Sequence, residues 1–213
     1  MKTREQLESD VVQLVQSHYY SEDFELLSAF QAYVHGLSES EKNDVAGIAF
    51  SRLIHEGSMV DILLCSVVNV PSAAPVLAEK LNREPHSNQV TRALIAALKT
   101  YATDDAYTAV ERFLDSDQEL ETLQALACID FVRTLPYLVR LIRKEHVHGI
   151  ALHILHDRSK AVGLDRLVEE LRLSSATQSA GFRENLAKTL RSKKDPYNPF
   201  SEAEILRILH AIG

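Results

Sequence analysis

Hydrophobic residues recur at intervals of three and four along most of the chain, which is the spacing of amphipathic α-helices. Residues 1–70 contain four such stretches. Ser38, with Glu41 three residues later, opens the third, and Ser58 opens the fourth, because serine side chains cap helix N-termini. The fourth stretch, 59–70, is apolar nearly all round and rich in β-branched residues. A strand is the alternative there, but no second segment could pair with it, so we predict a buried helix.

From residue 72 to residue 191 the pattern becomes regular, with two amphipathic segments and a short turn repeated at intervals of about 30 residues. A further helix is predicted over 200–213, where Ser201 and Glu204 form a capping box. The paired segments are 74–81 with 90–101, 106–114 with 120–129, 135–142 with 147–155, and 164–171 with 182–190. Equivalent apolar residues near the ends of the leading segments are Leu81, Leu114, Ile142 and Leu171.

This pattern predicts an all-α protein, an αα-superhelix of antiparallel helix pairs that forms one domain over 1–213. The domain would comprise irregular N-terminal helices over 1–70, regular helix pairs over 72–191 and a C-terminal capping helix over 200–213. All six prolines, Pro136 among them, are expected between helices or in a first turn, where the missing N–H costs little.

One stretch resembles a known repeat. FLDSDQELETLQALACI, residues 113–129, is similar to the HEAT repeat, which has Leu-Leu-x-Asp in its turn and Val-Arg-x-x-Ala-x-x-Ala-Leu in its second helix. Weaker similarity lies around Arg92 and Arg183, each followed by alanines, whereas Glu121 and His148 stand where the family usually has Arg. The comparable residues are Leu114, Asp115 or Asp117, Leu120, Ala125 and Ala127.

The resemblance implies a HEAT- or armadillo-like solenoid over about the last two thirds of the chain, acting as a scaffold that binds a protein on its concave face. In such arrays the second helix of each pair usually lines that face. The residues that this places toward a partner are Arg92, Gln124, His148, His153 and Arg183.

Enzymes of this fold are not indicated by the residues. Alkylation-repair glycosylases use a basic face with tryptophan, but this chain has net charge −7 and no Trp. Deoxyhypusine hydroxylase-like proteins bind two irons through repeated His-Glu dipeptides, and only His55-Glu56 occurs here. Nothing identifies the tetrapyrrole site of phycobilin lyase-like members. Without a phosphate loop, a Cys-x-x-Cys pair or a nucleophile elbow, we predict no catalytic residue and no cofactor.

The charge balance favours a protein partner over nucleic acid, because binding to phosphates draws on clustered Lys and Arg. Between residues 104 and 121 seven carboxylates accompany one base, Arg112. Glu119 and Glu121 are therefore candidate contacts for a basic partner. Ordinary helix capping by acids in first turns is the alternative interpretation, and an acidic excess also keeps a protein soluble.

Localisation is predicted from the same composition. The start of the chain is polar, and Cys65 and Cys128 are expected as small core residues, which favours a reducing cytoplasm. The apolar run 62–70 is too short to span a membrane.

Histidines form the densest polar cluster, along one side of the segment 144–157. His153 and His156 are one helical turn apart, a spacing that can chelate a metal, but a third ligand is missing. We expect an exposed, metal-free ridge from His146 to His156 on a non-enzymatic interaction module. Two alternatives stay open: an immunity- or inhibitor-type protein that neutralises a basic enzyme, and a metal-binding or enzymatic protein centred on this ridge.

Overall fold

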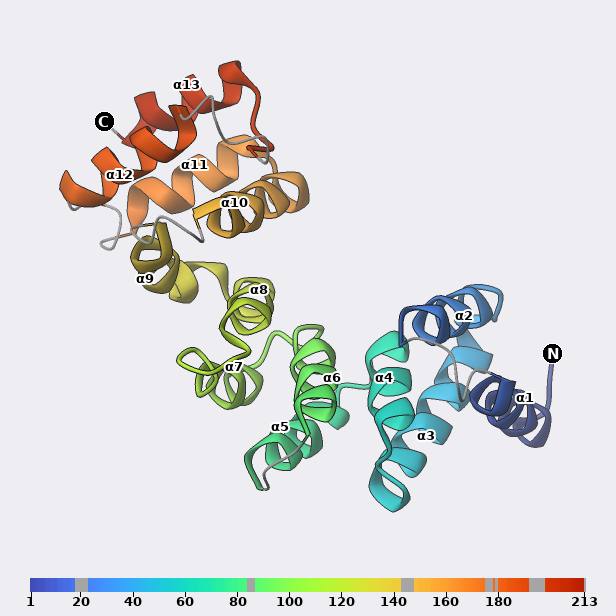
Figure 1. Cartoon of the computed structure of the whole chain (residues 1–213). Helices are drawn as coiled ribbons and strands as arrows, with labels where there is room; N and C mark the ends of the chain where they lie inside the picture. Colours follow the sequence, from blue (N-terminus) through green and yellow to red (C-terminus); the bar gives the residue numbers. More distant parts are fainter. Residues whose placement is uncertain are drawn as a thin grey trace. The chain divides into compact units, whose positions relative to one another are not determined.

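The computed structural model describes residues 1–17, 23–83, 87–142, 148–174, 178, 180–191 and 198–212. Within these residues the chain forms thirteen α-helices and no strand, which confirms the prediction of an all-α protein (Figure 1). The chain divides into two compact units, Met1–Ala125 (unit 1) and Leu126–Gly213 (unit 2). The arrangement as one superhelical domain stays a prediction.

In unit 1, most contacts between helices join a helix to the next but one along the chain. Helices α1, α3, α5 and α7 contact each other in that order, as do α2, α4 and α6, and α3 with α4 and α5 with α6 pack as neighbours. This is the contact pattern of hairpins stacked in two rows. The helices are α1 (Arg4–Ser17), α2 (Asp23–His35), α3 (Glu39–His55), α4 (Met59–Val68), α5 (Ala73–Arg83), α6 (Asn88–Leu98), α7 (Asp104–Glu111) and α8 (Glu119–Ile129), which runs on into unit 2.

The predicted helix starts in unit 1 are present. Ser38 and Glu41 form a reciprocal capping box at α3, and Ser58 forms one with Asp61 at α4. The segment that could have been a strand is thus a capped helix. Asp61 is fully buried and also accepts a 2.8 Å hydrogen bond from Nε of Arg52, so one carboxylate joins the end of α3 to the start of α4.

Polar links between successive hairpins tie α4 to the end of α6 and α5 to α7. The hydroxyl of Tyr101 donates to the carbonyl of Cys65 over 2.9 Å, and Nη1 of Arg112 donates to Oδ1 of Asn82 over 2.8 Å. Burial raises the pKa of the Tyr101 phenol, so it stays a donor. These bonds satisfy polar groups beside the apolar core, where unpaired ones would be costly.

In unit 2, each helix from α9 to α13 packs against at least two others. Helix α13 contacts α11 and α12 and so joins the two helices of the fourth predicted pair, while α9 contacts α10 and α12, and α10 also contacts α11. The helices are α9 (Phe131–Ile142), α10 (His148–Val162), α11 (Leu164–Leu173), α12 (Ala180–Arg191) and α13 (Glu202–Ile212).

Arg158 connects three helices of unit 2. Its Nε and Nη2 donate to the two carboxylate oxygens of Glu170 over 3.0 and 2.6 Å, and its guanidinium lies 5.1 Å from the ring centroid of Phe131. Glu170 is buried. The hydrogen bonds to Glu170 raise the pKa of Arg158, so its guanidinium stays charged.

Two predictions from the sequence, one about Pro136 and one about Cys128, are wrong. Pro136 was expected in a first turn, but α9 begins at Phe131, where Asp130 Oδ1 accepts from the N–H of Arg133, and Pro136 lies inside the helix. Its side chain is exposed, so water can reach the helix surface around the missing backbone bond. Cys128 was expected in the core with Cys65; Cys65 is buried, whereas Cys128 is exposed.

The apolar residues predicted as equivalent between repeats all lie in the core. The exposed fractions are 3% for Leu81, 4% for Leu114, 5% for Ile142 and 0% for Leu171. The helix stripes read from the sequence therefore point inward in both units. Among the described helices, none has the length and apolar character needed to cross a membrane.

Candidate protein-binding surface

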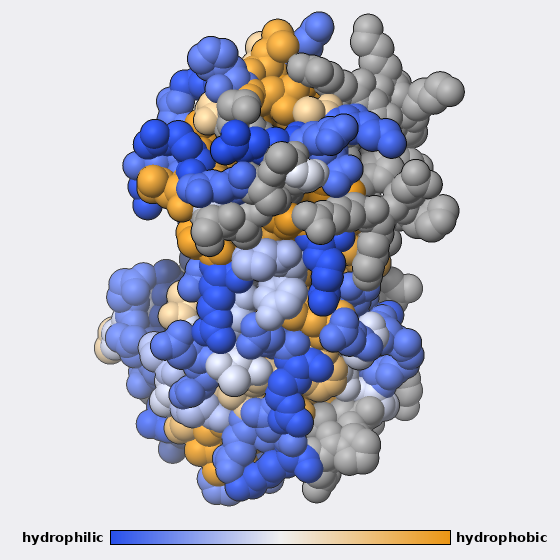
Figure 2. Space-filling view, turned by 90° about the vertical axis from the view of Figure 1, so that its left-hand side faces the viewer, coloured by the Kyte–Doolittle hydropathy of each residue, from blue (hydrophilic) through white to orange (hydrophobic). Residues whose placement is uncertain are grey.

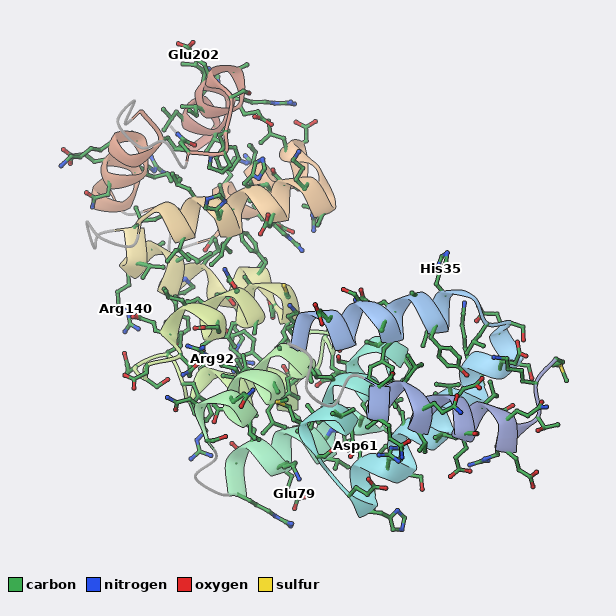
Figure 3. All side chains as sticks on the ribbon, turned by 45° about the vertical axis from the view of Figure 1, so that its right-hand side comes forward. His35, Asp61, Glu79, Arg92, Arg140 and Glu202 are labelled. Carbon is green, nitrogen blue, oxygen red and sulfur yellow. The ribbon has the colours of Figure 1, made fainter. Side chains whose placement is uncertain are left out.

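Two of the predicted contact residues in unit 1, Arg92 and Glu121, form an ion pair. Arg92 lies on α6 (Figure 3). It donates from Nε to Oε1 of Gln118 over 2.7 Å, and its Nε lies 3.4 Å from Oε1 of Glu121 on α8. Gln118 is buried, with 4% of its surface exposed. The arginine therefore links successive hairpins. Gln118 was missed from sequence, because only the fold brings it under Arg92.

The acidic residues around α7 and α8 present carboxylates to solvent. Of the seven, Asp104, Asp105, Asp115 and Asp117 are exposed and the three glutamates are half-buried. Asp104 and Asp105 lie in the first turn of α7, which Thr103 caps. Glu119 and Glu121 lie in the first turn of α8. Helix-start chemistry thus accounts for four positions, and Asp115 and Asp117 lie in the connecting turn.

Gln124 is exposed on α8, as predicted, one turn beyond Glu121. Cys128 follows four residues later on the same helical face and is exposed too. Figure 2 shows hydrophilic residues over much of one face, with apolar areas between them. Within α8, Gln124 and Cys128 are the exposed residues.

The histidine cluster of unit 2 is not uniformly exposed. His153 is exposed, but the ring of His156 is half-buried and meets the ring of Phe200 edge-on, with centroids 5.3 Å apart. Leu152 is also buried on α10, a helix that packs against both α9 and α11. A fully exposed ridge was therefore a wrong prediction.

The other predicted residues of unit 2 are placed only in part. His146 and the side chain of His148 lie outside the described residues. Arg183 is half-buried on α12. Within the described ranges, no group of three or more His, Cys, Asp and Glu could hold a metal ion.

A cleft of about 740 Å³ lies in the α1–α2 region of unit 1. Asp10 accepts from Lys2 Nζ over 2.6 Å and from the Tyr33 hydroxyl over 3.1 Å. The hydrogen bond from Lys2 lowers the pKa of Asp10, while burial and the Asp10 charge raise the pKa of Tyr33. Lys2 therefore favours the ionised form of Asp10, and Asp10 favours the protonated phenol of Tyr33.

Comparison of the chain with protein-family models, with curated proteins and with solved structures gives no match.

Proposed function

We propose that the chain is a non-enzymatic protein-binding module, an αα-superhelix of the HEAT-like kind. Its acidic surface, formed at α7 and α8 by the carboxylates between Asp104 and Glu121, binds a basic protein partner. The observation that supports it most is the contact pattern of unit 1, in which helices two places apart pack together in two rows. Stacked hairpins of this kind leave an extended polar face free for partners.

The proposed binding surface includes fewer residues than the set predicted from the sequence. Because Arg92 and Glu121 form an ion pair, changing either residue would also remove a contact between α6 and α8. Asp105, Asp117 and Gln124 are exposed and lie around the same helices. Exposed carboxylates mainly steer association with an oppositely charged protein and set its rate.

A cytoplasmic location belongs to the same proposal. Both cysteines are free thiols, which fits a reducing compartment. On this proposal the module acts among intracellular proteins.

The test is affinity capture with the full chain and two matched variants. Asp105→Asn with Asp117→Asn removes two charges from the acidic surface, and Glu8→Gln with Glu25→Gln removes two exposed charges from α1 and α2. Captured proteins are quantified by mass spectrometry, with circular dichroism to check folding. We expect basic proteins captured by the wild type and the control pair to be depleted with the acidic-surface pair. Equal capture by all three would contradict the proposal.

A further inference from the structure

A groove of about 270 Å³ lies in unit 1 where α2, the start of α3 and the end of α4 meet. Helices α2 and α4 pack against each other, so the groove is part of the row formed by α2, α4 and α6. Its lining is half apolar and half polar. We call the apolar part, Val34, Val67 and Val68, the floor, and the polar part, Gln31, His35 and Lys42, the rim.

The floor is not completely covered by the protein itself. All three valines are half-buried, in contrast to Ile62, Leu64 and the other core residues of α4. Covering apolar surface is favourable by roughly 25 cal/mol for each Å² removed from water. An apolar side chain of a partner placed between these valines would therefore gain from the contact.

The rim offers hydrogen-bond donors, among them one ammonium group, that of Lys42. Among the described residues that line the groove there is no carboxylate, although the chain as a whole has net charge −7. Lys42 Nζ lies 2.6 Å from Glu39 Oε1, but the side chain of Glu39 is 87% exposed. Water screens such a pair, so a carboxylate of a partner can replace Glu39 at little cost.

His35 adds a third nitrogen-bearing group to this rim. It is exposed at the C-terminal end of α2 and projects from the helix (Figure 3). Together with the amide of Gln31 and the ammonium of Lys42, it makes the rim complementary to an anionic group placed beside an apolar one.

We propose that this groove docks a segment of a protein partner that carries a leucine-like anchor flanked by carboxylates. The inference rests on the proposed function and deepens it. The partner would place an acidic, apolar segment on the groove and a basic region on the α7–α8 surface, both within unit 1. This opposite pattern of charge along one unit would fix the direction in which the partner binds.

The experiment uses the full chain with labelled valine methyl groups, titrated by NMR with three synthetic peptides of equal length. The first has leucines at helical spacing among glutamates, the second has lysine in place of each glutamate, and the third has alanine in place of each leucine. We expect saturable shifts of Val34, Val67 and Val68 with the first peptide only.

Two variants and a control test the parts of the groove. Lys42→Glu should weaken binding of the acidic peptide about tenfold, as expected for loss of a charged hydrogen bond. Val67→Gln should abolish the saturable shifts by filling the floor with an amide. Ile54→Gln is the matched control, because Ile54 is 55% exposed on α3 outside the groove, and it should bind as the wild type does.

Absence of saturable shifts, or equal shifts with the lysine peptide, would overturn the inference. Unchanged binding by Lys42→Glu, with circular dichroism showing a folded chain, would overturn the role of the rim. The outcome is separate from that of the capture experiment, since neither Asp105 nor Asp117 lines the groove. Groove binding can therefore fail while the acidic surface still captures basic proteins.

Discussion

Replacing Asp61 with alanine should destabilise unit 1 more than most other single changes of a charged residue. The carboxylate is fully buried, and it accepts from the backbone N–H of Ser58 over 3.0 Å, from the Ser58 hydroxyl over 2.5 Å and from Arg52 Nε over 2.8 Å. Alanine removes all three acceptor contacts at once. It leaves Arg52, whose side chain is only 18% exposed, beside an apolar methyl group.

The size of the effect follows from these contacts. Removing one partner of a buried ion pair costs about 3–5 kcal/mol, and loss of a helix cap costs about 1 kcal/mol. Arg52 keeps a second partner, Glu56, at 2.9 Å, which places the ion-pair loss at the lower end of its range. We therefore expect Asp61→Ala to lower the free energy of unfolding by about 4 kcal/mol, and Asp61→Asn, which keeps the shape, by about half as much.

The assay is urea denaturation followed by circular dichroism, with Asp61→Ala, Arg52→Ala and the double variant forming a double-mutant cycle. We expect a coupling energy of about 2 kcal/mol. Glu39→Ala is the control, because its pair with Lys42 is exposed, and it should change the free energy by no more than about 0.5 kcal/mol. A loss under about 1 kcal/mol for Asp61→Ala, or no coupling to Arg52, would refute the reasoning.

Three further predictions concern titration, reactivity and packing. Hydrogen bonds from Ser38 and from the backbone N–H of residue 2 lower the pKa of Glu41 from 4.5 to about 2. Ionised Glu41 therefore stabilises the folded chain above the unfolded pKa, and this contribution is lost as pH falls from 4.5 toward about 2. The difference in melting temperature between wild type and Glu41→Gln should shrink over this range, and a constant difference would contradict the prediction. A thiol-reactive disulfide reagent should modify Cys128 in the native chain but not Cys65, because Cys65 is buried and burial raises its pKa to about 12. Rapid loss of both thiols would contradict this prediction. His156→Ala should cost about 1 kcal/mol through the lost ring contact, whereas His153→Ala should stay within about 0.5 kcal/mol; equal costs would argue against that contact.

The helices and their starts could be predicted because their causes are local. Apolar spacing, and the serines that precede α3, α4 and α13, act within a few residues along the chain. The true start of α9 had a local signal as well, since Asp130 is a good capping residue. The prediction placed the helix start near Pro136, six residues later, because proline is disfavoured inside helices. The exposed surface of α9 nevertheless tolerates Pro136.

The candidate site could be predicted less well, because its residues are defined by packing between helices. Helical spacing does place Cys128 on the same face as Gln124, and that signal could have identified it as exposed. No spacing rule could show that Arg92 meets Gln118 and Glu121, which lie 26 or more residues away. The contact of His156 with Phe200 likewise joins residues 44 apart, because it depends on how the segment before α13 folds back onto α10.

The most direct test of the central claim is the association rate of the most abundant basic protein captured by the wild type, measured on an optical biosensor at low and at physiological salt. Charge steering is screened over a Debye length of about 8 Å at physiological ionic strength. We predict that Asp105→Asn with Asp117→Asn slows association several-fold at low salt and much less at physiological salt, with Glu8→Gln and Glu25→Gln unchanged. Equal association rates for the wild type and both pairs at low salt would contradict the claim that the α7–α8 surface binds a basic partner.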